Sequence, residues 1–113
     1  MTDTSSLGGF VAIAIHHAAP EHEEAFIAFM HDVVAATEGA PGLLAFEACR
    51  HPDGEYLAGV STWESAEAFQ AGLERIGSLS HLRRPEWSAK PDEVITLVPL
   101  QRPELDSNQR PTP

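Results

Sequence analysis

The chain has 113 residues and a formal net charge of −10, from 7 Lys and Arg against 17 Asp and Glu. This length suits a single domain. The acidic excess argues against nucleic acid and against an anionic membrane surface, because both require clustered cations. The lone Cys49 excludes a disulfide framework and a cysteine-based zinc site. No apolar run reaches membrane-spanning length and no signal peptide is evident, so we expect a cytoplasmic protein.

The two ends of the chain differ in composition from the part between them. Residues 1–9 are small and polar, and residues 101–113 include three prolines with Leu105 as the one large aliphatic residue. Such segments bury little apolar surface, so we expect a flexible leader over 1–9 and a flexible Pro-rich tail over 101–113. One folded domain, residues 10–100, is predicted between them.

A strand and a helix are predicted first. Residues 10–17 are mostly apolar in both alternating sets, which indicates a strand buried on two faces. Residues 21–38 carry apolar side chains at spacings of three and four, which indicates an amphipathic helix that Gly39 and Pro41 end. The apolar stripe of this helix consists of Phe26, Phe29, Met30, Val33, Val34 and Thr37.

The second half of the domain continues the alternation. Residues 43–50 and 56–63 are predicted strands joined by a turn. Ser65 is a suitable N-cap for a second helix, which ends at Gly77 and Ser78. A short helical turn over residues 79–84 precedes a last strand over residues 94–100.

The element order strand-helix-strand-strand-helix-strand predicts an α+β fold of the ferredoxin-like type. Right-handed crossovers then give a four-stranded antiparallel sheet with both helices on one face. The strands are apolar on both faces, and a bare apolar sheet of this size indicates a partner surface. We therefore predict a homodimer in which two sheets pack face to face, a dimeric α/β barrel.

Three segments carry a resemblance to a known family. They are FVAIAIHHAAPEHEEAF at residues 10–26, EGAPG at residues 38–42 and TWESAEAF at residues 62–69. Over residues 10–100 the chain resembles the antibiotic biosynthesis monooxygenase family of small dimeric α+β barrels. The resemblance implies an oxidoreductase of the monooxygenase type, in a family that includes quinone-forming oxygenases and heme-degrading enzymes.

Two residues are the candidates for catalysis. His81 follows Phe69 by 12 residues, and in the heme-degrading branch a helix of similar pattern supplies the axial histidine at about this spacing. His81 could instead be a general base for a hydroquinone proton, or a surface histidine beside Arg83. Trp63 could form the wall over which a planar substrate lies, or could fill the end of the core.

A substrate cleft is expected between the helices and the sheet. The residues predicted to bind substrate there are His16, His17, Phe26, Phe69, Gly72 and Trp87. His16 and His17 point to opposite sides of their strand, so one of them reaches the cleft. The heme degraders carry a tryptophan where this chain has Gly72, and they carry a strand asparagine that this chain lacks. We therefore do not expect heme degradation, and we interpret Gly72 as leaving room for a ligand.

Two functions follow from these residues. The first is a cofactor-independent monooxygenase that acts on a small phenolic or quinol-like aromatic, because an electron-rich phenolate can pass an electron to oxygen by itself. His81, His16 or His17 would accept the phenol proton. The alternative is a non-catalytic binding protein for a small aromatic or for heme, with His81 as axial ligand. No metal site is predicted, since no Cys/His cluster has zinc spacing.

Overall fold

The computed structural model describes residues 8–100. The predicted leader, apart from Gly8 and Gly9, and the predicted tail lie outside the described residues. In chain order the main elements are β1 (Phe10–Ala18), α1 (Glu23–Thr37), β2 (Leu43–Arg50), β3 (Leu57–Trp63), α2 (Ala66–Gly77) and β4 (Ser88–Leu97). Short 3-10 turns cover Pro20–His22, Ser80–Leu82 and Pro85–Trp87.

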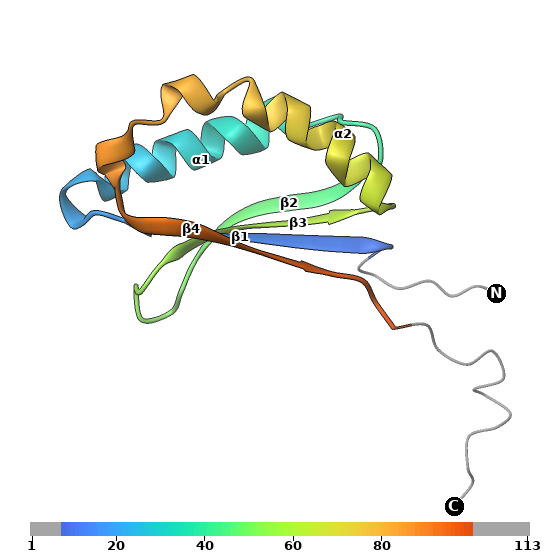
Figure 1. Cartoon of the computed structure of the whole chain (residues 1–113), viewed down its shortest axis with the longest axis horizontal. Coiled ribbons are helices and arrows are strands. Elements are labelled where there is room, and N and C mark those ends of the chain that lie inside the picture. The colour runs from blue at the N-terminus through green and yellow to red at the C-terminus, as the bar shows by residue number, and fades with distance from the viewer. Residues whose placement is uncertain (1–7, 101–113) are drawn as a thin grey trace, which may run out of the picture.

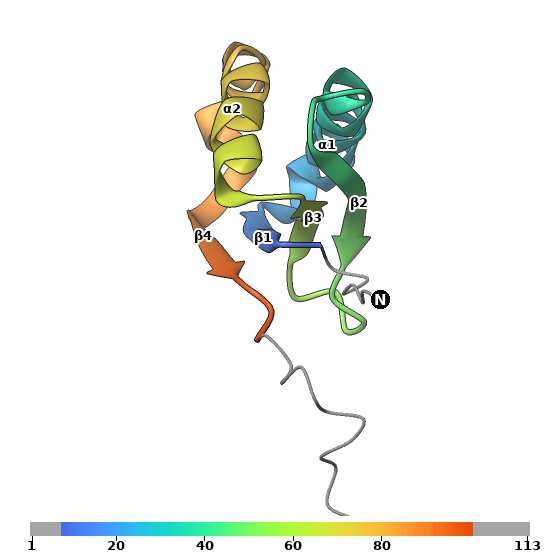
Figure 2. The same ribbon diagram turned by 90° about the vertical axis from the view of Figure 1, so that its right-hand side faces the viewer.

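The strands form one antiparallel sheet in the order β2-β3-β1-β4. Both helices lie on the same face of this sheet, and the opposite face carries no helix (Figures 1 and 2). The segment between α2 and β4 runs beside the start of α1 before it enters the sheet (Figure 1). This arrangement confirms the predicted ferredoxin-like α+β fold.

The predicted helix ends agree with the local chemistry. Gly39 has a φ of 82°, the left-handed conformation that a residue just beyond a helix often adopts. The Ser65 hydroxyl accepts a hydrogen bond from the backbone N–H of Ala68 at 3.1 Å, and so caps α2 as predicted. On α1 the buried residues are Phe26, Met30, Val33 and Thr37, all of them members of the predicted stripe.

The last strand differs from its prediction. β4 begins at Ser88, six residues before Val94, and ends at Leu97. Its first half contains Pro91 and charged residues, a composition that does not predict a strand. β4 is an edge strand that pairs with β1 alone, so one side of its backbone needs no ladder partner and proline is tolerated there.

The uncovered sheet face keeps large apolar side chains in solvent. Ile13 on β1 pairs with Ile95 on β4, and Val11 pairs with Leu97 in the same ladder. Ile95 is 41% exposed and Leu97 is 50% exposed. Within residues 8–100, no helix has both the length and the apolar character that a membrane crossing needs.

Candidate functional site

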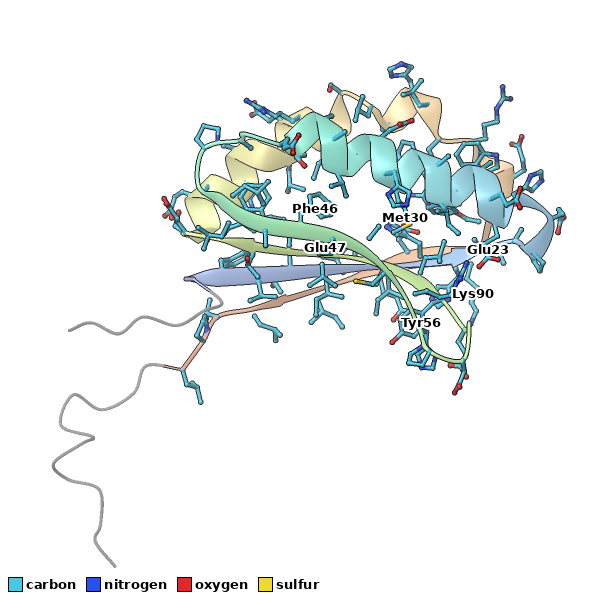
Figure 3. The ribbon with its side chains drawn as sticks, turned by 180° about the vertical axis from the view of Figure 1, so that it is seen from behind. Glu23, Met30, Phe46, Glu47, Tyr56 and Lys90 are labelled. Carbon is cyan, nitrogen blue, oxygen red and sulfur yellow. The ribbon has the colours of Figure 1, made fainter. Side chains whose placement is uncertain are left out.

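A cavity of about 260 Å³ lies between the helix layer and the sheet. Most of its lining is apolar and comes from both helices and from β1, β2 and β4. The apolar lining residues are Ala12, Ala14, Phe29, Met30, Val33, Val34, Phe46, Ala48, Phe69, Leu73, Ile76 and Val94. Figure 3 shows two of them, Met30 and Phe46, in the space between α1 and the sheet. A mostly apolar space of this kind suits a small ring-containing ligand.

Small residues in one cross-strand row open this cavity. Ala48 on β2 pairs with Gly59 on β3, and Gly59 pairs with Ala14 on β1. All three line the cavity, and the Phe46 ring lies over Gly59, where an added Cβ would be 3.3 Å from Cε1 of Phe46. The buried core is correspondingly divided into two clusters, one around Trp63 and Phe69 and one around Phe26 and Met30.

Ionisable side chains gather at one end of the cavity. His16, Arg83 and Asp92 line it there, with Asp92 in contact with both of the others. The β1–β4 ladder is irregular at this point: Ile15 pairs with Glu93, but the next pair is His17 with Lys90. Such irregularities change the direction of a side chain, and this one lies where His16 faces Asp92.

The His16 imidazole contacts the Asp92 carboxylate. Nδ1 of His16 lies 3.1 Å from Oδ1 of Asp92, and the His16 side chain is 15% exposed. Nδ1 is buried and makes no well-formed hydrogen bond within the described part of the chain. We therefore describe this pair as an electrostatic contact. Phe26 packs against the imidazole, with ring centroids 5.1 Å apart, and so holds the orientation of the ring.

Arg83 binds the same carboxylate from the segment between α2 and β4. Its Nη1 donates to Oδ2 of Asp92 at 2.7 Å, and its Nη2 donates to Oδ1 at 2.8 Å. Nη2 also donates to Oγ of Ser88 at 2.8 Å, and the guanidinium lies 4.8 Å from the centre of the Phe26 ring. This two-point pairing fixes Asp92 more firmly than a single lysine contact would.

The charge state of Asp92 follows from these neighbours. Burial alone would raise the pKa of this carboxyl, because its side chain is only 28% exposed. The hydrogen bonds from Arg83 lower this pKa, and so does the nearby His16 imidazole. The net result is a pKa of Asp92 below the ordinary value. Asp92 is therefore a carboxylate at neutral pH, and its charge offsets that of Arg83.

The structure separates the predicted substrate-binding residues. His16 and Phe69 line the cavity. His17 faces the opposite side of the sheet, where its Nε2 lies 2.8 Å from Oε2 of Glu93. Phe26 and Trp87 do not contact the cavity; they pack on each other behind His16, with ring centroids 6.2 Å apart.

The geometry around Trp63 and Gly72 corrects two expectations. Trp63 is 0% exposed and is not among the cavity-lining residues; it fills the end of the core. The indole lies directly against Gly72, so that a Cβ at this position would collide with it. The missing side chain at Gly72 thus makes room for Trp63 and not for a ligand.

His81 is exposed and does not line the cavity. Its Nδ1 lies 3.1 Å from the carbonyl oxygen of Ser78, in the same turn. An axial ligand for a heme in the cavity would have to face that space, so the residues present do not fit a heme held there by His81. Among residues 8–100, no three His, Cys, Asp or Glu side chains are grouped to hold a metal ion.

Asp92, which contacts His16, and Arg83, which binds Asp92, were not predicted from the sequence as site residues. Asp92 lies in a segment that was not predicted to be a strand, and Arg83 was named only as a neighbour of His81. The signal for Asp92 was present in its position, two residues before Val94, since alternate residues of a strand share one face. Arg83 carried no such signal, because it lies outside the regular elements.

The family is decided by a match over residues 9–74, more than half of the chain, to the model of the antibiotic biosynthesis monooxygenase family. The chain belongs to this family. The match contains His16 but ends before Arg83 and Asp92. The polar end of the cavity in this antibiotic biosynthesis monooxygenase family member is therefore built in part from residues beyond the matched region.

Solved structures share the fold of this family member. Rv0793 from Mycobacterium tuberculosis is 19% identical with a TM-score of 0.69, over 84% of this chain and 98% of that chain. The heme-degrader MhuD of the same organism, solved with two hemes in its active site, is 23% identical with a TM-score of 0.65. This match covers 82% of the present chain and 97% of MhuD. A Streptomyces coelicolor monooxygenase in complex with nanaomycin D is 20% identical with a TM-score of 0.65. This match covers 87% of the present chain and 93% of the monooxygenase. No curated protein matches the sequence.

Proposed function

We propose that the chain is a monooxygenase that oxidises a small phenolic or quinol-like aromatic in the cavity between the helices and the sheet, without a cofactor. The observation that carries this proposal is the position of His16, an imidazole that lines a mostly apolar cavity beside Asp92. The family membership and the solved complex of a monooxygenase with nanaomycin D agree with it.

In this proposal His16 accepts the phenol proton. Nδ1 is buried against Asp92, so Nε2 is the ring nitrogen left for the substrate hydroxyl. A carboxylate beside Nδ1 favours the tautomer with its proton on Nδ1, which leaves Nε2 free to act as a base. The same carboxylate stabilises the imidazolium that forms, and the apolar walls hold the ring away from water.

The proposed reaction balances with dioxygen as the oxidant. A phenol with a hydrogen on the opposite ring carbon reacts with O2 to give a quinone and water. One oxygen atom forms the new carbonyl, and the other leaves as water with the hydroxyl hydrogen and the ring hydrogen. The ring is oxidised and dioxygen is reduced, while His16 holds the proton between its removal and the formation of water.

Filling the cavity tests this function. Ala14 lies in the small-residue row of the sheet, so the phenyl ring of an Ala14→Phe variant would occupy the ligand space. We expect wild type to bind 2-naphthol by fluorescence titration, and Ala14→Phe to bind it on the order of 100-fold more weakly. Ala28→Phe, the same change on the exposed face of α1, should bind like wild type.

Oxygen uptake separates the two candidate functions. Wild type should consume oxygen with a panel of hydroquinones and naphthols, and Ala14→Phe should not. Binding of 2-naphthol without oxygen consumption across the panel would favour the non-catalytic binding protein. Equal binding by wild type and Ala14→Phe would reject the cavity as the site of either function.

We further propose that two copies pair through their uncovered sheet faces. The exposed Ile95 and Leu97 would be buried in such a homodimer. Light scattering should then give about twice the 12.2 kDa chain mass, and Leu97→Glu should lower it to that of one chain. Leu82→Glu, which changes an exposed leucine outside the sheet, should stay dimeric. A monomeric wild type would contradict the pairing.

A further inference from the structure

We infer that Asp92 is a specificity-determining residue, which makes the cavity select aromatics with a neutral polar group and reject aromatic carboxylates. This inference rests on the proposed function, because it concerns the ligand of the same cavity. It follows from how the charges at the polar end are paired.

The two fixed charges inside the cavity balance each other. Among the described residues that line it, the ionisable ones are His16, Arg83 and Asp92. Arg83 is the fixed cation and Asp92 is the fixed anion, so the two cancel when the imidazole is neutral. With a neutral imidazole, a ligand therefore meets a polar end that carries no net charge.

The guanidinium of Arg83 is already occupied by Asp92 and Ser88. Both nitrogens of its fork donate to the Asp92 carboxylate, at 2.7 and 2.8 Å, and Nη2 also donates to Ser88 at 2.8 Å. An arginine that binds a ligand carboxylate at two points uses either Nη1 with Nη2 or Nε with Nη2. Both edges include Nη2, which already donates to Asp92 and to Ser88. A ligand carboxylate would have to displace Asp92, or enter beside it as a second anion.

A second carboxylate would lie beside Asp92 in a partly desolvated environment. Most of the lining is apolar and the Asp92 side chain is only 28% exposed, so repulsion between two carboxylates is screened less there than in bulk water. A charged group that loses its hydration without gaining a partner binds unfavourably. A phenol or an amide avoids this cost, because it enters uncharged and can hydrogen-bond to the free side of the His16 ring.

Three naphthalene derivatives of similar size provide the test. 2-Naphthol and 2-naphthamide are neutral at pH 8, whereas 2-naphthoate is an anion with nearly the shape of the amide. At pH 8 an imidazole is ordinarily neutral as well. We expect wild type to bind the alcohol and the amide, and to bind 2-naphthoate at least about tenfold more weakly in fluorescence titrations.

Asp92→Asn should reverse this selection. The substitution keeps the shape of the side chain but removes its charge, which frees the charge of Arg83 for a ligand. Binding of 2-naphthoate should then improve by at least about tenfold while binding of 2-naphthamide changes little. Asp53→Asn, the same change in an exposed turn, should leave all three affinities as in wild type.

The outcomes distinguish this inference from the proposed function. Wild type that binds 2-naphthoate as tightly as 2-naphthamide would overturn the inference and leave the small-aromatic function standing. A folded Asp92→Asn that still rejects 2-naphthoate would overturn it as well. Failure of wild type to bind any of the three would reject both. The affinities of wild type for 2-naphthamide and 2-naphthoate test the proposed selectivity even if Asp92→Asn does not fold.

Discussion

His16→Ala is expected to lower the rate of oxygen consumption by about 10²–10⁴-fold, the usual contribution of a positioned general base. Without the imidazole, nothing at the polar end is placed to accept the phenol proton, since Asp92 is held by Arg83. The affinity for 2-naphthol should fall much less, because the apolar walls that hold the ring remain. The loss should therefore be in kcat more than in KM.

The matched control for this prediction is His81→Ala. His81 is exposed and outside the cavity, so its removal should leave both oxygen uptake and 2-naphthol affinity near their wild-type values. The opposite pattern, a large loss in His81→Ala and none in His16→Ala, would transfer the role of base to His81. Circular dichroism of both variants would show that neither loss results from unfolding.

Trp63→Ala should have the largest effect on stability, a loss of about 3–5 kcal/mol in the free energy of unfolding. Trp63 is fully buried, packs edge-on against Phe69 at 5.8 Å between ring centroids, and donates from Nε1 to the Ser61 hydroxyl at 2.9 Å. Its removal would leave an empty volume next to Gly72 and would remove the hydrogen bond that Ser61 Oγ accepts. Urea unfolding at one fixed protein concentration would measure the loss.

Two comparisons make the role of Trp63 specific. Trp87→Ala should cost less, since Trp87 is only partly buried. Gly72→Ala should also destabilise the protein, because its new methyl group would collide with the indole. Trp63→Phe should be less damaging than Trp63→Ala and should still bind 2-naphthol. A stable Trp63→Ala that has lost only ligand binding would instead support a role for Trp63 as the wall of the ligand site.

Two features that depend on residues close together in the chain were predicted correctly, whereas one that depends on distant residues was not. The α1 stripe and the Ser65 cap are set by residues close together in the chain, and both were predictable. Gly72 shows the opposite case. Its small size was interpreted as room for a ligand above the sheet, but sequence cannot tell whether a ligand or a distant indole fills that space. Trp63 fills it because β3 ends beneath α2.

The sequence by itself determined the element order, the antiparallel ferredoxin-like sheet and the likeness to the antibiotic biosynthesis monooxygenase family, because periodicity, caps and motifs are local properties. The tertiary structure alone decided which histidine faces the cavity with a carboxylate beside it. His16 and Asp92 are separated by 76 residues in the chain and meet through the pairing of β1 with the edge strand β4. That pairing depends on the ladder as a whole, which tolerates a proline and charged residues at an edge.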